Sequence, residues 1–121
     1  MKNENISIYR EESEGQLTID VWQNDSEIVI ESTVAGVDAD ELDIDITSES
    51  VTIRGERQKK EEVAEDNYLY QECYWGKFSR SVILPQEVDP EKAQADFKNG
   101  VLIIRLPKLI RSTGKKLKIR K

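Results

Sequence analysis

Apolar residues recur at every second position over most of this chain, and this alternation constrains the fold more than any other feature of the sequence. Successive side chains of a β-strand point to opposite faces of a sheet, so a spacing of two gives the strand one dry face and one wet face. Residues 42–46, Leu-Asp-Ile-Asp-Ile, show the pattern most clearly. The same reasoning predicts strands at residues 17–21, 27–34, 51–57, 77–84, 93–98 and 101–106. The sequence therefore predicts an all-β, immunoglobulin-like, two-sheet antiparallel β-sandwich.

Turn and loop signals separate the predicted strands. Asn99-Gly100 is the dipeptide that best fits a tight type I′ hairpin turn, because both residues tolerate a positive φ. Only residues 37–42 and 89–92 could hold a helical turn. Residues 58–67 are almost wholly polar and predict a long mobile loop. The aromatic-rich residues 68–75 that follow are expected to be extended.

The chain has 121 residues, which suits a single domain with an apolar core of its own. Apolar residues make up 37% of it and charged residues 35%, so the core is expected to lie beneath a heavily charged surface. No stretch approaches the ~20 apolar residues that span a membrane, and residues 1–5 open no secretory signal. We therefore expect a soluble, cytoplasmic protein.

The residue types that are missing exclude most enzyme classes. There is no histidine, which removes His-based general bases, Ser-His-Asp triads and imidazole metal ligands. The single cysteine, Cys73, allows no internal disulfide, and the six glycines are too dispersed for a phosphate-binding loop. A reactive thiol at Cys73 is less favoured than a buried or half-buried, inert one. A calcium loop starting at Asp38 would have Leu42 and Asp43 where an oxygen ligand and a glycine are needed. We therefore expect that this chain is not an enzyme and that it binds no cofactor and no metal.

Charge is unevenly distributed along the chain. The formal net charge is −6, yet residues 105–121 hold eight basic residues and no acidic one, against 10 basic and 24 acidic residues in 1–104. A basic tail could bind the phosphates of a nucleic acid, but the acidic body would repel them and no aromatic residue stands among the tail bases. We favour a tail that is drawn to the acidic surface of its own or a neighbouring subunit, and expect no nucleic-acid or membrane partner.

Leu117-Lys118-Ile119 places two apolar residues at a spacing of two inside this basic tail. On a strand both side chains would point to the same side. That suits a short peptide that adds to a sheet edge and inserts two side chains into adjacent pockets. Two isolated apolar residues in a tail can equally have no role, since exposed leucines are common.

Five motifs, taken in order, resemble those of the small heat-shock proteins, the α-crystallin domain family. The clearest is Ala-Asp-Phe-Lys-Asn-Gly-Val-Leu at residues 95–102, which resembles the A-x-x-x-n-G-V-L signature. The other four are residues 34–37 for (L/V)-P-G-V with Ala35 in place of proline, 51–57 for L-x-I-x-G-x-R/K, 76–85 for G-x-F-x-R…L-P, and 117–119 for the tail I/V-x-I/V. The resemblance covers residues 16–119.

The resemblance implies an ATP-independent molecular chaperone, a holdase that binds partly unfolded client proteins and prevents their aggregation under stress. It divides the chain into a short N-terminal arm (1–15), an α-crystallin β-sandwich domain (16–107) and a basic C-terminal tail (108–121). The family's arm usually has several tens of residues, so we expect a homodimer and at most a small oligomer here. The alternative is a monomeric co-chaperone-type β-sandwich that binds one defined protein partner.

The resemblance also assigns contacts between subunits. Strand exchange would dock a loop segment of one subunit beside an N-terminal strand of the other, here Tyr68, Leu69, Tyr70, Gln71, Glu72 and Cys73 beside Leu17, Ile19 and Val21. The tail motif, Leu117 and Ile119, would dock in a groove that also takes clients and is lined by Leu42, Ile44, Ile46, Ala93 and Ala95. Arg80 matches the family's arginine near the dimer contact and is expected to pair with acids.

Overall fold

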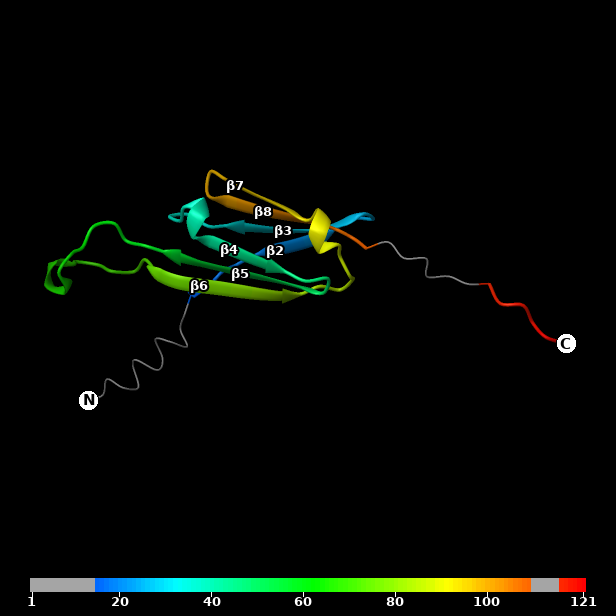
Figure 1. Ribbon diagram of the computed structural model, residues 1–121. Coiled ribbons are helices and arrows are strands. Elements are labelled where there is room, and N and C mark those ends of the chain that lie inside the picture. The colour runs from blue at the N-terminus through cyan, green and yellow to red at the C-terminus, as the bar shows by residue number, and fades with distance from the viewer. Residues whose placement is uncertain (1–14, 110–115) are drawn as a thin grey trace.

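Two four-stranded sheets face each other across an apolar core in the computed structural model, which describes residues 15–109 and 116–121 (Figure 1). One sheet has the order β1 (Gly15–Gln16), β6 (Gly76–Ile83), β5 (Ser50–Arg57), β4 (Leu42–Ile46). The other has the order β2 (Asp20–Gln23), β3 (Glu27–Thr33), β8 (Val101–Pro107), β7 (Gln94–Lys98). Neighbouring strands are antiparallel except β1 and β6, which are parallel. The predicted all-β two-sheet sandwich is confirmed.

The core forms where the dry faces of the alternating strands meet. Ile28 and Ile30 of β3 lie directly opposite Leu106 and Ile104 of β8, and all four side chains are fully buried. Residues opposite each other in an antiparallel pair share a face, so these four point together toward the other sheet. That sheet contributes Val51, Ile53 and Phe78. The alternation in the sequence thus marks the faces that become the interior.

The turns follow the local chemistry of their residues. Asn99 (φ 54°) and Gly100 (φ 78°) both have a positive φ between β7 and β8, as a type I′ turn requires. The short 3₁₀ helices η1 (Ala39–Glu41) and η3 (Pro90–Lys92) lie in the two segments expected to hold a helical turn. A third, η2 (Glu65–Asn67), was not anticipated. Within the described residues no helix is long and apolar enough to cross a membrane.

The predicted N-terminal strand at residues 17–21 is split in two, which corrects the sequence-based expectation. Leu17 remains with the first sheet, because its N–H donates to the carbonyl oxygen of Ser79 (3.4 Å) and its side chain is buried in the core at 5% exposure. The chain then crosses to the second sheet, where β2 begins at Asp20 opposite Glu31. The apolar residues that alternate over residues 17–21 are therefore divided between the two sheets.

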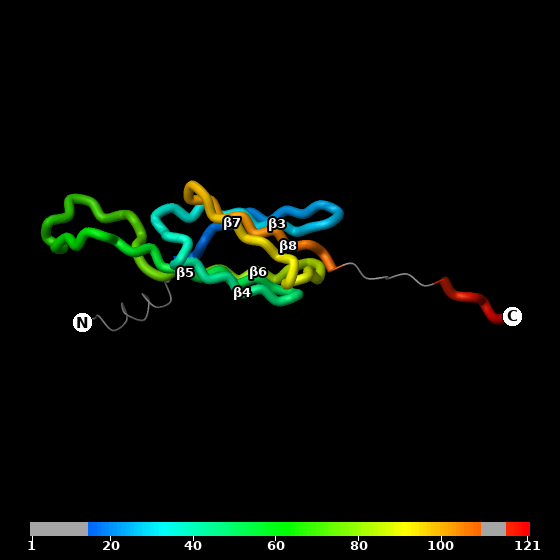
Figure 2. Tube along the Cα trace, turned by 45° about the horizontal axis from the view of Figure 1, so that its top comes forward, coloured from blue at the N-terminus to red at the C-terminus, as the bar shows by residue number. Residues whose placement is uncertain are grey.

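The loop predicted at residues 58–67 extends to residue 75 and projects beyond one end of the sandwich in both views (Figure 1 and Figure 2). Residues 68–75 form no strand in the single chain, although we expected an extended segment. The Lys59 ammonium lies over the rings of Tyr68 (5.5 Å) and Trp75 (5.6 Å), which come from the returning arm of the loop. These cation–π contacts hold the two arms of the loop together.

Candidate functional site

The free edge of β2 is the first candidate surface, because apolar side chains remain partly exposed there. β2 ends its sheet, so one side of its backbone has no neighbouring strand within the described residues. Val21 and Trp22 of this strand are both partly exposed. An unpaired strand with exposed apolar side chains is suited to pairing with another chain.

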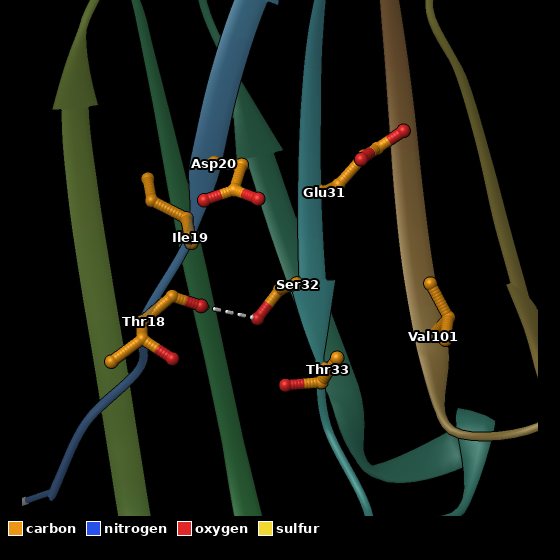
Figure 3. A pocket seen from close by; sticks show the side chains of 7 residues that line it. All are labelled: Thr18, Ile19, Asp20, Glu31, Ser32, Thr33 and Val101. Atoms are coloured by element: carbon orange, nitrogen blue, oxygen red, sulfur yellow. Dashed lines mark hydrogen bonds between the residues drawn. The ribbon is translucent and has the colours of Figure 1, made fainter.

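A hollow of about 170 Å³ lies at the start of β2, between the segment that crosses the sheets and strands β3 and β8 (Figure 3). It is lined by Thr18, Ile19, Asp20, Glu31, Ser32, Thr33 and Val101. The buried Ser32 donates its hydroxyl to the carbonyl oxygen of Thr18 (2.7 Å), which ties the crossing segment to β3. The hollow thus lies on the β3 side of the crossing segment.

The second surface is the returning arm of the loop. Leu69 is 93% exposed and Tyr70 is 85% exposed, and Cys73 is also exposed. The expectation that Cys73 is buried or half-buried is therefore wrong for the single chain. The structure does not bring the predicted loop segment and the predicted N-terminal strand together within one chain. Of the three strand residues, Leu17 is in the core, Ile19 packs partly against the core, and Val21 lies on the open edge.

The base of the loop is anchored to the sandwich. Arg57 donates from Nε to the carbonyl oxygen of Ala35 (2.7 Å), and its guanidinium lies over the ring of Phe78 (5.3 Å). On the other arm, the Tyr74 hydroxyl donates to the carbonyl oxygen of Lys77 and accepts from the N–H of Gly15 (3.1 Å). These bonds fix where the loop leaves the sandwich.

The third surface lies along β4 and β7, which are the last strands of their two sheets. The predicted residues Leu42, Ile44 and Ile46 are half-buried and pack against the core from β4. Ala95 of β7 lies opposite the buried Ile104 and so faces inward, yet it is exposed. Its small side chain leaves the inward side of the edge uncovered. We call the inward-facing residues of these two edges the apolar track.

Sequence reasoning missed one member of the apolar track, Phe97. It lies opposite the buried Leu102, is half-buried, and packs against the core together with Ala93. The period of two from Ala93 through Ala95 was the signal that could have found it. Phe97 bounds the small-residue stretch of β7 at one end.

The tail motif is separate from these surfaces in the single chain. Leu117 is 78% exposed and Ile119 is 88% exposed, and the segment 116–121 lies apart from the sandwich (Figure 1). The predicted docking of this motif on the apolar track stays a prediction. Both side chains are free to contact another molecule.

Arg80 is half-buried and bonds to backbone. Its Nη1 donates to the carbonyl oxygen of Leu17 (2.9 Å). The two ion pairs of the described residues involve other arginines, Arg54 with Asp45 and Arg105 with Glu27. In the single chain Arg80 therefore fixes the crossing segment rather than pairing with an acid.

The sandwich and its motifs agree with comparisons to known proteins. The model of the Hsp20/alpha crystallin family matches residues 20–120. The chain belongs to this family. Among its relatives, small heat shock protein C4 of Rickettsia felis is 42% identical over 100 residues, which cover 83% of this chain and 61% of the Rickettsia protein. This chain therefore aligns with less than two thirds of that relative's length.

Solved structures of small heat-shock proteins show the same fold. Heat shock protein 16.0 from Schizosaccharomyces pombe superposes with a TM-score of 0.73 at 30% identity, over 89% of this chain and 100% of that chain. A small heat-shock protein from Xylella fastidiosa superposes with the same TM-score at 21% identity, over 90% of this chain and 100% of that one. Membership of the small heat-shock family supports a chaperone role.

Proposed function

We propose that this chain is an ATP-independent holdase, which binds partly unfolded proteins and keeps them from aggregating. The observation that carries the proposal is the apolar track, where inward-facing side chains of two edge strands stay partly uncovered. Unfolding clients expose extended apolar segments, and an open sheet edge can pair with such a segment through its backbone. Family membership supports the same role. The cytoplasmic location stays a prediction.

Filling the apolar track should weaken protection of a client. Ala95 is exposed, so Ala95→Arg can place its side chain there without displacing the core. The matched control is Asp96→Arg, which places the same side chain on the outer face of the same strand, since Asp96 lies opposite Ile103. We expect the unmodified chain and the Asp96 variant, without ATP, to suppress the light scattering of a heat-denatured enzyme, and the Ala95 variant to suppress it at least twofold less.

An unmodified chain that leaves the client as turbid as an inert protein does would overturn the holdase proposal. Equal protection by both variants would remove the apolar track from client binding. Circular dichroism of the two variants would confirm that each keeps its strands.

We further propose that two copies form a homodimer by exchanging the loop arm. The exposed Leu69 and Tyr70 of one copy would cover the edge of β2 in the other, where Val21 and Trp22 are also partly exposed. Because Leu17 is in the core, the pairing would begin at Asp20, where β2 starts. Burial of these side chains supplies the driving force, at roughly 25 cal/mol per Å² of apolar surface.

Charges placed on the loop arm should separate the dimer. We expect light scattering on a sizing column to give twice the chain mass of 13.9 kDa, or an even multiple of it, for the unmodified protein, and one chain mass for Leu69→Asp/Tyr70→Asp. Val63→Asp is the control, since Val63 is an exposed apolar residue of the same loop outside the exchanged segment. A strict monomer for the unmodified chain would favour the co-chaperone alternative.

The tail would join such dimers into small oligomers by docking Leu117 and Ile119 on the apolar track of another subunit. The small heat-shock protein from Xylella fastidiosa has a distinct high order structure, which supports assembly beyond the dimer within the family. Since both side chains are exposed in the single chain, they are available for a neighbour. The homodimer remains the unit that this contact would link.

A further inference from the structure

The tail and strand β4 have complementary alternation. β4 reads Leu-Asp-Ile-Asp-Ile, with Leu42, Ile44 and Ile46 on the inward face and Asp43 and Asp45 exposed on the outer face. Residues 116–120 read Lys-Leu-Lys-Ile-Arg, so apolar residues there alternate with basic ones, whereas in β4 they alternate with acidic ones. If the tail lies beside β4 as a strand with its apolar residues inward, its basic residues fall on the same face as the two aspartates.

The carboxylates on β4 are accessible to such a partner. Asp45 accepts a hydrogen bond from Arg54 Nη1 (3.0 Å), with the Arg54 side chain 56% exposed and that of Asp45 67% exposed. Exposed ion pairs of this kind contribute little to the stability of the fold. Asp43 lies directly opposite Arg54 on β5, yet within the described residues it forms no ion pair. The outer face of β4 can therefore receive cations from a neighbouring strand.

The edge strand of the other sheet, β7, offers less charge selectivity for a basic tail. The outer residues of β7 are Gln94, Asp96 and Lys98, so one acid is offset by one base along that strand. Two copies of β4 would also pair poorly, because aspartates would face aspartates across the junction. Charge thus favours one arrangement, in which the basic tail pairs with β4.

We infer that the tail of a second copy, residues 116–121, adds to the free edge of β4 as a strand whose register and partner are selected by Lys116 and Lys118 opposite Asp43 and Asp45. This inference rests on the proposed docking of the tail and specifies what recognises it. Opposite charges directly across two strands stabilise the pair, and dissolved salt screens that contribution. Tail docking is therefore salt-regulated.

The same recognition specifies a class of client. An extended segment that alternates apolar and basic residues would compete with the tail for β4, and an alternating acidic segment would not. The tail then acts as an occupant that such clients displace. Raising the salt concentration would release the tail while leaving the apolar contacts, which salt does not screen.

A labelled peptide with the sequence of residues 115–121 tests this inference by fluorescence anisotropy. The host is the full chain with Leu117→Ala/Ile119→Ala, so that its own tail competes weakly. We expect binding to weaken about fivefold when the host also carries Asp43→Asn/Asp45→Asn, from two cross-strand charge pairs. For the host that keeps Asp43 and Asp45, raising the NaCl concentration should weaken peptide binding by a similar factor.

Two controls separate pairing from general charge attraction. A host with Asp25→Asn/Glu61→Gln loses the same two charges at exposed positions away from β4 and should bind as before. A second peptide has the same composition but places leucine and isoleucine next to each other, so the alternation is lost. It should bind at least fivefold more weakly than the peptide in natural order. A peptide with glutamate at positions 116, 118 and 120 should bind only to a host carrying Asp43→Lys/Asp45→Lys.

The outcomes distinguish the two levels of proposal. If the unmodified peptide does not bind the host at low salt, the docking of the tail itself is rejected, and the charge pairing with it. If the peptide binds but its affinity changes neither with salt, nor with the aspartate substitutions, nor with the order of its residues, the docking of the tail stands. The charge pairing is then overturned.

Discussion

At the scale of single residues, Gly55 explains part of the motif at residues 51–57. A Cβ at this position would lie 2.5 Å from Cζ of Phe78 and 3.1 Å from the carbonyl oxygen of Glu41. Phe78 is itself a core residue at the opposite position on β6. Glycine is required here because the aromatic ring packs directly on the backbone, not because of an unusual φ.

Gly55→Ala should therefore destabilise the fold. The added methyl group must displace the Phe78 ring or the backbone of Glu41, and overpacking of this kind costs about 1–3 kcal/mol. The free energy of unfolding in urea measures the effect. Thr52→Ser on the outer face of the same strand keeps the hydroxyl that bonds Ser81 Oγ (3.2 Å) and should change stability by less than ~0.5 kcal/mol. Equal stability of the two variants would contradict this account.

At the scale of elements, the crossing between β1 and β2 decides which edge is open to a partner. Three bonds hold the crossing: Leu17 N–H to Ser79, Arg80 to the Leu17 carbonyl, and Ser32 to the Thr18 carbonyl. Together they leave only the four residues of β2 at the edge of the second sheet. The place of β2 thus depends on side chains far away in the sequence.

Removing Arg80 should loosen that crossing. In Arg80→Ala the half-buried carbonyl of Leu17 loses its charged donor, and we expect a loss of about 1–2 kcal/mol in stability. Hydrogen exchange should accelerate at the amides of residues 17–19 more than at those of β5. The matched control is Arg54→Ala, because Arg54 belongs to an exposed ion pair and its loss should cost under ~1 kcal/mol. Similar losses in both variants, without local exchange, would refute the role of Arg80.

At the scale of the whole molecule, most of the exposed large apolar side chains lie on the edge strand β2, on the loop at residues 58–75 and on the tail, while Ile83 at the end of β6 is also 80% exposed. The central strands β5, β6, β3 and β8 supply most of the core, while the strands at the ends of the sheets carry the candidate contacts. The folded domain therefore does not consume all of its apolar surface, and the remainder is available to other chains.

Protection of clients and assembly should respond little to pH near neutrality. The chain has no histidine, the side chain that ordinarily changes charge between pH 5 and 8. We expect light-scattering assays at pH 6.5 and pH 7.5, at fixed salt, to differ by less than a factor of two in both native mass and client protection. A larger difference would point to a titrating group that this account does not include.

Much of the fold follows from local properties of the sequence. A period of two identifies a strand and its dry face, as in residues 42–46, and Asn99-Gly100 specifies its turn because few other dipeptides accept two positive φ angles. The motif at residues 95–102 likewise marks the β7–β8 hairpin. These features depend on neighbours along the chain, so the strands outside residues 17–21, their faces and the sandwich class follow from the sequence alone.

Features that depend on residues far apart in the sequence become visible only in the folded chain. Alternation at residues 17–21 does not show that the chain changes sheets there, because the cause is a contact with β6 more than 60 residues away. Nor does it show that Ala95 is exposed on an inward face while Ala93 is half-buried, or that Phe97 closes the apolar track. Strand order determines which edges stay open, and strand order is set by packing between segments far apart in sequence.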